Sequence, residues 1–331
     1  MLNQVYRDID VNMDVMKDKV VAVMGYGIQG RPQALNMRES GVKVIVGAGP
    51  RDRFSDWNKA EMDGFEVFDF AEATKRADIV HMLLADPAQP PIYREFIHKN
   101  LKPNSTLSFC HGFNVLYGAI LPPKNVNVVL FVPNSPGHLV REKFLEGSGI
   151  YGAIAVDQDV TGDAKEIVLA IAKAVGSTRV GTVEVNFQTE TEGDNFEEQV
   201  LYGGAIHLMR ATFETMVAHG YPPYFAYAKA IRSLRSVVDV MDEIGIEGYI
   251  SERGSRTMEF AVRMNGPRVI NLEEIEKILQ ETERGEFAAR WMQEWNLGMP
   301  HLHRMRRTRA ESEMEKVGKE WRELFGDTEG D

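Results

Sequence analysis

The sequence contains little of what several classes of protein require. A single cysteine, Cys110, among 331 residues excludes an intramolecular disulfide and a cysteine-based metal cage, and it fits a reducing compartment. No apolar run is long enough to span a bilayer, and acids occur in residues 1–10, where a signal peptide has a basic and then an apolar segment. The formal net charge of -11 argues against a protein that tracks nucleic-acid phosphates. We therefore expect a cytoplasmic protein with a small-molecule ligand and with no membrane or nucleic-acid partner.

The residues that are present are those of a folded chain with two domains. Apolar residues make up 44% of the sequence, and its length suffices for two domains. Short apolar runs alternate with helical patterns up to about Val185, which predicts an α/β Rossmann domain with a doubly wound parallel sheet. Long helical segments bounded by Gly or Pro follow, and these predict an all-helical domain. We place the domains at residues 1–183 and 184–331.

The individual elements follow from the same patterns. Strands are predicted at residues 20–24, 42–46, 79–84, 106–110, 128–132 and 150–156. Helices of the second domain are predicted at residues 196–219, 224–244, 272–284 and 287–296.

A glycine-rich segment follows the first predicted strand and opens a helix: Gly25-Tyr26-Gly27-Ile28-Gln29-Gly30. In this context a GxGxxG pattern predicts a dinucleotide site. Gly25 permits the tight turn, Gly27 lets backbone amides approach the pyrophosphate, and Gly30 lets the helix pack closely on the strand. The alternative is a tight strand-to-helix turn without a ligand.

The end of the second strand bears on the choice of nucleotide. It lacks the acid that holds the ribose hydroxyls in an NAD-selective site, and Arg51, Arg53 and Ser55 follow it. These side chains suit a 2′-phosphate, although Asp52 and Asp56 are interleaved with them. We expect NADPH in preference to NADH.

Two further positions carry candidate chemistry. Asp194 and Glu198 lie four residues apart, so on an α-helix they share a face and suit a divalent cation. They also fit a helix surface without a ligand. His111 follows a predicted strand at the carboxyl edge of the sheet, where open α/β folds bind ligands. We expect it near the nicotinamide, with a hydrogen-bonded loop histidine as the alternative.

Several motifs follow one another along the chain: the glycine segment, His111-Gly112-Phe113-Asn114, Pro136-Gly137-His138, Glu190-Thr191-Glu192, Asp194 with Glu198-Gln199, and Gly285-Glu286-Phe287-Ala288 with Gly298-Met299-Pro300. With these motifs, nearly the whole chain resembles the short form of the ketol-acid reductoisomerase family. The resemblance implies an N-terminal Rossmann domain, an all-helical C-terminal domain that interlocks with a dimer partner, NADPH and two magnesium ions. It also implies migration of an alkyl group within a 2-hydroxy-2-alkyl-3-keto acid, followed by reduction.

The sequence departs from this family at several catalytic and metal-binding positions. Asn134 replaces the lysine of the family's Pro-Lys-Gly-Pro-Gly-His loop. Lys229 and Ser233 occupy the frame of the two glutamates that bind the second metal. A protonated lysine cannot ligate a cation. The family's substrate-binding serine corresponds to Gly254 or Ser255, and the sequence leaves this register open.

We therefore expect a divergent member that reduces a small 2-keto acid, or a derived imine, with NADPH and without isomerase activity. The alternatives are an authentic reductoisomerase with an altered metal site and a non-catalytic NADP-binding protein. At most one Mg²⁺ is expected, at Asp194 and Glu198, and the assembly is expected to be a homodimer or a higher oligomer. The expected catalytic residues are His111, Asp194, Glu198 and Lys229, and the expected cofactor contacts are Gly25, Tyr26, Gly27, Ile28, Gln29, Gly30, Arg51, Arg53, Ser55, His111 and Asn134.

Overall fold

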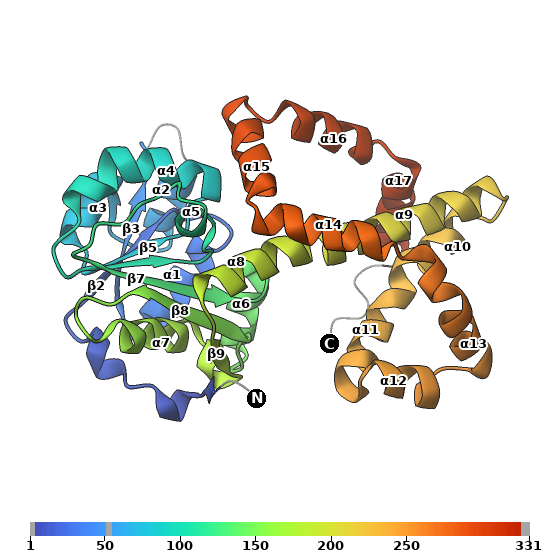
Figure 1. The fold of residues 1–331 in the computed structure, drawn as a ribbon, viewed down its shortest axis with the longest axis horizontal. Helices are drawn as coiled ribbons and strands as arrows, with labels where there is room; N and C mark the ends of the chain where they lie inside the picture. The colour runs from blue at the N-terminus through green and yellow to red at the C-terminus, as the bar shows by residue number, and fades with distance from the viewer. Residues whose placement is uncertain (1–3, 51–54, 326–331) are drawn as a thin grey trace. The chain divides into compact units, whose positions relative to one another are not determined.

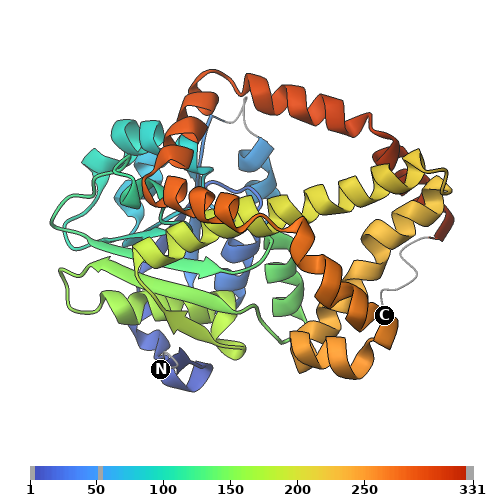
Figure 2. The ribbon, with the colours of Figure 1, turned by 45° about the vertical axis from the view of Figure 1, so that its right-hand side comes forward.

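A computed structural model describes residues 4–50 and 55–325 of the chain. It divides into two compact units, Met1–Gly193 and Asp194–Asp331. The first, the N-terminal unit, is α/β, and the second, the C-terminal unit, is helical (Figures 1 and 2). The expected fold class is confirmed, whereas the expected domain boundary at residue 183 stays a prediction.

The N-terminal unit contains a nine-stranded sheet with the order β1-β9-β8-β7-β6-β5-β2-β3-β4. All six predicted strands are present, with ends shifted by no more than a few residues. Three very short strands, β1, β4 and β9, escaped prediction because two or three residues carry no readable pattern. The strands are β1 (Val5–Tyr6), β2 (Val20–Met24), β3 (Lys43–Ala48), β4 (Val67–Asp69), β5 (Ile79–Met82), β6 (Thr106–Phe109), β7 (Asn127–Pro133), β8 (Gly152–Gln158) and β9 (Thr182–Glu184).

Strand β8 departs from the expected parallel arrangement, because it runs antiparallel to β7, with Pro133 opposite Gly152. The connecting helix α6 (Gly137–Leu145) has nine residues, so at ~1.5 Å per residue it covers only about 13 Å. Gly147 then adopts a left-handed φ of 79°. The chain thus returns to the end of β7 at which it left, and β8 starts there.

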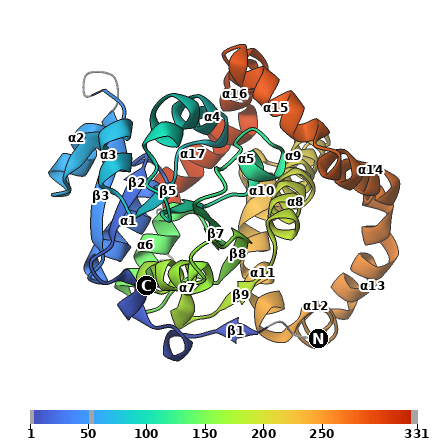
Figure 3. The ribbon, with the colours of Figure 1, turned by 60° about the vertical axis from the view of Figure 1, so that its left-hand side comes forward.

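Helices cover both faces of this sheet (Figure 3). Successive strand residues point to opposite faces, so Val21 and Val23 of β2 join the apolar layer that contains α1 and α7. Ala22 and Met24 join the layer that contains α3. The helices of this unit are α1 (Gly30–Glu39), α2 (Ser55–Met62), α3 (Phe70–Arg76), α4 (Gln89–Ile92), α5 (Phe113–Leu116), α6 and α7 (Ala164–Val175).

The C-terminal unit is less regular than its sequence pattern suggests. The helix expected at residues 196–219 starts earlier, as α8 (Phe187–Phe196), which spans the division between the units. The π-helical segment Glu197–Tyr202 separates it from α9. The helix expected at 224–244 is likewise interrupted by a π-helical segment, Ala228–Arg232. The helices are α9 (Gly203–Ala218), α10 (Pro223–Tyr227), α11 (Ser233–Ile244), α12 (Ile246–Gly248), α13 (Arg256–Asn265), α14 (Leu272–Glu283), α15 (Glu286–Asn296), α16 (Pro300–Ala310) and α17 (Glu313–Phe325).

The buried apolar cluster of the C-terminal unit is small. It joins α9, α10 and α17 (Figure 2), and its members are Phe213, Ala226, Tyr227, Ala230 and Met314. Within residues 4–50 and 55–325, no helix is long and apolar enough to cross a bilayer.

Candidate functional site

Four neighbouring parallel strands bring their following loops to one edge of the sheet. Strands β7, β6, β5 and β2 are adjacent in that order and run parallel. The chain passes from β2 to β3 and β4 on one side and then to β5 on the other, so the strand order reverses between β2 and β5. Open α/β sheets bind ligands at such a switch point.

The glycine turn after β2 has the geometry that a dinucleotide needs. Gly25 has a left-handed φ of 94°. A Cβ on Gly30 would lie 2.1 Å from the carbonyl oxygen of Gly25, so only glycine lets α1 start this close to the strand. A Cβ on Gly27 would meet nothing within 4 Å, which leaves its backbone open to a ligand. The turn therefore fits a bound pyrophosphate at the start of α1.

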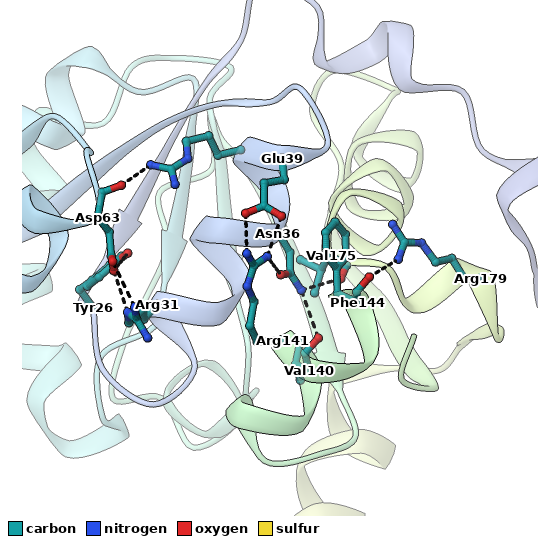
Figure 4. Close-up of polar contacts among 11 residues, drawn as sticks. Tyr26, Arg31, Asn36, Glu39, Asp63, Val140, Arg141, Phe144, Val175 and Arg179 are labelled. Atoms are coloured by element: carbon teal, nitrogen blue, oxygen red, sulfur yellow. Dashed lines mark hydrogen bonds and ion pairs between the residues drawn. The ribbon is translucent and has the colours of Figure 1, made fainter. Parts of the chain in front are cut away.

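Tyr26 belongs to this turn, and its side chain is buried. Its hydroxyl donates a hydrogen bond of 2.8 Å to Asp63, and Arg31 donates two hydrogen bonds to the same carboxylate (Figure 4). Arg31 holds the pKa of Asp63 below its ordinary value, and burial raises that of Tyr26. Tyr26 thus anchors the turn to the residue that follows α2, while its expected cofactor contact stays a prediction.

A cavity of about 880 Å³ opens beside the glycine turn and runs along α1 between α2 and α6. Its volume is within the range of ligand pockets, roughly 300 to 1,000 Å³. Arg31, Lys59 and Arg141 supply three cationic groups against the acid Asp63. Arg141 also donates hydrogen bonds to Asn36 and Glu39 of α1 (Figure 4). The lining residues are Tyr26, Gly27, Ile28, Arg31, Pro32, Leu35, Lys59, Met62, Asp63, Gly137, His138 and Arg141.

His111 lies where the sequence placed it, directly after β6, and it has a partner that the sequence did not reveal. Its Nδ1 is 2.9 Å from Oδ2 of Asp86, which follows β5. Gln89 donates to the other carboxylate oxygen of Asp86 at 3.4 Å, and Asn114 donates to its backbone carbonyl at 2.9 Å. The carboxylate is thus oriented from two sides. An acid at the end of the neighbouring parallel strand was the available signal, since both strand ends meet at this edge.

Asn134, the expected cofactor contact after β7, is exposed at the same edge. Its backbone N–H donates to the carbonyl of Tyr151 at 3.0 Å. The N-terminal unit therefore brings the glycine turn, His111 and Asn134 to one edge.

The start of α8 packs directly on the His111 turn. A Cβ on Gly112 would lie 2.0 Å from Oγ1 of Thr191 and 3.1 Å from the ring of Phe187. Glu190, one residue before Thr191, is also buried, and Thr191 donates a hydrogen bond to it at 3.3 Å. A carboxylate missing from the expected catalytic set is therefore carried by the helix that covers His111.

Asp194 and Glu198 lie on either side of the junction between α8 and the π-helical segment Glu197–Tyr202, and their expected shared face stays a prediction. Asp194 is half-buried in α8, whereas Glu198 is exposed in the π-helical segment, whose turns close between residues i and i+5. Tyr202 lies near both: its hydrogen bond to Glu197 raises its pKa, and burial and the charges of Glu197, Asp194 and Glu198 add to that rise. No group of three or more His, Cys, Asp or Glu side chains in the described part of the chain could hold a metal ion.

Lys229 and Ser233, at the two positions that the resemblance assigns to ligands of the second metal, do not form a ligand pair. The ammonium of Lys229 lies 5.5 Å from the centroid of the Phe225 ring. The hydroxyl of Ser233 donates to the carbonyl of Lys229 at 2.7 Å, so its hydrogen bond is made to the preceding turn of the same helix. These residues do not fit a second magnesium ion, and the predicted contact between Lys229 and Asp194 stays a prediction.

The expected 2′-phosphate contacts fall outside these observations. Arg51 and Arg53 lie in residues 51–54, which the structure does not describe, and only the position of Ser55 at the start of α2 is described.

Comparisons with known proteins match the two units separately and the chain as a whole. Residues 15–181 match the family described as acetohydroxy acid isomeroreductase, NADPH-binding domain, and residues 187–326 match ketol-acid reductoisomerase, C-terminal domain. Ketol-acid reductoisomerases (NADP(+)) from Methanocaldococcus jannaschii and Pyrococcus abyssi are each 45% identical over 327 residues, which is 98% of both chains. An NADH-preferring ketol-acid reductoisomerase from an uncultured archaeon superposes with a TM-score of 0.93 at 38% identity, covering 98% of this chain and 99% of that one.

Proposed function

Because the chain belongs to the ketol-acid reductoisomerase family, we propose that it is an NAD(P)H-dependent reductase of a small 2-keto acid, or of an imine derived from one, without the isomerase step. One observation carries this proposal: Lys229 and Ser233 stand where the resemblance places two glutamate ligands, and each is engaged elsewhere. Alkyl migration needs two metal ions to gather the substrate oxygens and stabilise the developing charge. Reduction needs a hydride, a polarised carbonyl or imine, and a proton.

The residues of the N-terminal unit suit the requirements of reduction. The glycine turn and the start of α1 would hold the pyrophosphate of a dinucleotide, whose nicotinamide would supply a hydride. His111 gives the proton to the substrate oxygen or nitrogen. Asp86, 2.9 Å from Nδ1, fixes the orientation of the imidazole.

We further propose NADPH as the preferred nucleotide. The acid-free end of β3, with Arg51, Arg53 and Ser55 after it, supports this choice. A charge-assisted phosphate contact is worth roughly 1.5 to 3 kcal/mol, about tenfold or more in affinity. Fluorescence titrations with NADPH and NADH test it, and equal dissociation constants that an Arg51→Ala, Arg53→Ala variant leaves unchanged would overturn it.

The second candidate is an authentic reductoisomerase. The 45% identity over nearly full length with proteins of that name favours it. In this case a rearranged metal site would serve the alkyl migration.

We also propose that the chain acts as a cytoplasmic homodimer. The small core of the C-terminal unit supports a dimer, because this unit leaves large apolar side chains exposed, including Phe260 at 69% and Leu272 at 74%. Exposed apolar patches often mark protein interfaces.

The deciding experiment is an NADPH-oxidation assay of the purified chain with three kinds of substrate, each with and without Mg²⁺: acetolactate, 3-hydroxy-3-methyl-2-ketobutyrate and a panel of 2-keto acids. We expect reduction of a 2-keto acid and no consumption of acetolactate. Acetolactate turnover at an ordinary enzymatic rate, on the order of one per second, would establish the reductoisomerase instead. Cofactor binding without turnover of any substrate would identify a non-catalytic protein.

A matched variant separates the two enzyme classes further. The double variant Lys229→Glu, Ser233→Glu restores the family's ligand types. If the missing ligands abolish the isomerase step, this variant should bind Mg²⁺ more tightly than the unmodified chain, as measured by isothermal titration calorimetry. Unchanged metal affinity would show that the two positions do not face the metal site.

A further inference from the structure

A chain of polar side chains crosses the apolar layer between the sheet and α1. His81 of β5, Ser108 of β6 and Gln33 of α1 are all fully buried. His81 pairs with Val23 on one side and with Ser108 on the other, so all three residues face α1. Buried polar groups are costly unless they are hydrogen-bonded. A histidine on this strand face therefore needs an explanation.

Each of these polar groups has a partner. Nδ1 of His81 is 2.9 Å from Oγ of Ser108, and its Nε2 is 3.0 Å from Oε1 of Gln33. Nε2 of Gln33 donates to Oε1 of Gln29 at 3.1 Å, and Nε2 of Gln29 donates to the backbone carbonyl of Ser135 at 3.0 Å. A branch runs from Gln33 to Sγ of Cys110 at 3.3 Å, next to His111.

The last acceptor, the backbone carbonyl of Ser135, fixes the direction of every hydrogen bond in this series. A backbone carbonyl only accepts, so Gln29 must donate its amide N–H to Ser135 and present its oxygen to Gln33. Gln33 must then present its own oxygen to His81, and this requires a proton on Nε2 of His81. Ser108 donates to the remaining nitrogen. All four hydrogen bonds point the same way, an arrangement in which each bond strengthens the next.

This chain of hydrogen bonds ends at two loops on the edge of the sheet where the glycine turn lies. Gln29 belongs to the glycine turn, and Ser135 belongs to the loop after β7. The two loops touch through backbone: a Cβ on Gly137 would lie 1.9 Å from the carbonyl oxygen of Ile28. A contact this close depends on the loops keeping one relative position.

We propose that His81 and Gln33 are positioning residues for the nicotinamide nucleotide: their hydrogen-bonded chain holds the glycine turn against the loop after β7 and thereby sets cofactor affinity. This inference rests on the cofactor site proposed above and extends it to residues that contact no ligand.

The test is a double-mutant cycle on the full chain, read by NADPH fluorescence titration. Gln33→Met keeps the side-chain volume and removes the bonds to His81, Gln29 and Cys110. Gln29→Met removes the bonds to Gln33 and Ser135. Losing a hydrogen bond that orders a binding loop corresponds to about tenfold in the dissociation constant. We expect each variant to weaken NADPH binding by about that factor. The double variant should bind NADPH little more weakly than either single variant, because both substitutions interrupt the same series of hydrogen bonds.

Thr74→Val is the matched control. Thr74 is fully buried in the same unit and donates one hydrogen bond to the carbonyl of Phe70, but it lies in the other apolar layer. It should lower stability without changing the NADPH dissociation constant. Additive effects in the cycle, or an equal loss of affinity in Thr74→Val, would overturn the proposal.

A second readout needs no variant that might fail to fold. In ¹⁵N-histidine NMR spectra of the unmodified protein, His81 should show one neutral tautomer with its proton on Nε2. A mixture of tautomers, or a proton on Nδ1, would contradict the direction of the hydrogen bonds given above. Failure of the unmodified chain to bind either nucleotide would instead overturn the proposed function, because the tautomer is observed independently of any ligand.

Discussion

The two units of this chain bury their apolar residues very differently. The N-terminal unit packs two apolar layers against its sheet, and side chains such as Phe109 and Phe131 are wholly inaccessible. The C-terminal unit has a cluster of five buried residues, while Phe260 and Leu272 are mostly exposed. Burial of apolar surface is the main favourable term in folding. One unit thus has a complete apolar core within a single chain and the other an incomplete one, a difference that supports the proposed homodimer.

Polar groups show the same contrast. The N-terminal unit encloses His81 with partners on both ring nitrogens. The histidines of the C-terminal unit are all exposed: His207, His219, His301 and His303. This contrast is the one expected if a second copy covers the helical unit in the homodimer proposed above.

The sharpest way to test this contrast is to open a cavity in the complete unit. Phe131→Ala should lower the free energy of unfolding by about 3 to 5 kcal/mol, since a fully buried phenylalanine is removed from a close-packed layer. Urea denaturation followed by circular dichroism measures the change. Ile9→Ala, at a side chain 94% exposed in the same unit, is the control and should be nearly neutral. Equal losses would mean that the layer around Phe131 is not a packed core.

The buried histidine predicts a pH dependence for the same unit. Burial lowers the pKa of His81 to about 4, whereas an unfolded histidine titrates near 6.5. Below about pH 6.5, His81 is therefore protonated in the unfolded chain but stays neutral in the folded chain. The free energy of unfolding thus falls as the pH falls toward the pKa of the folded state. Between about pH 7 and pH 5 the loss should be about 2 kcal/mol.

Urea midpoints at the two pH values measure this loss, with His81→Gln as the reference for all other titrating groups. The unmodified chain should lose about 2 kcal/mol more than this variant. Identical losses in the two proteins would show that His81 is accessible to protons in the folded state.

The incomplete unit predicts an effect on association instead of folding. Phe260→Ser should weaken the dimer by about tenfold or more if a second copy covers this ring, because truncation of a buried interface aromatic costs at least ~1 to 2 kcal/mol. Sedimentation velocity over a dilution series measures it. Leu121→Ser, at a side chain 74% exposed in the N-terminal unit, is the control. A monomer at all concentrations would contradict the homodimer.

What the sequence revealed, and what it hid, follows the range of the interactions involved. The glycine turn was predictable because Gly25 and Gly30 act on their immediate neighbours, and His111 because a strand end has a fixed place in the sheet. The reversal at β8 was not, since it depends on the path of the chain through α6 and Gly147, which no local pattern fixes. The π-helical turn at Glu197 was hidden because an α-helix and a π-helix share a similar apolar pattern.

The pairings that build the site were hidden for a different reason. Asp86 and His111 are 25 residues apart, and His81 and Gln33 are 48 apart, so no local pattern joins them. Only the strand order, which places β5 between β2 and β6, brings these side chains together.

The smallest expected effect on stability belongs to Lys229, the residue on which the proposed function depends most. Its ammonium lies 5.5 Å from the centroid of the Phe225 ring, and such a contact contributes roughly 0.5 to 1 kcal/mol at an exposed site. Lys229→Met should therefore lower the free energy of unfolding by no more than about 1 kcal/mol. Phe225→Leu, which removes the ring and keeps the charge, should lower it by a similar amount. If the ammonium serves the substrate in place of a metal ion, kcat/KM for a 2-keto acid should fall strongly in Lys229→Met and only slightly in Phe225→Leu. Equal kcat/KM values in the two variants would reduce Lys229 to a surface contact of the C-terminal unit.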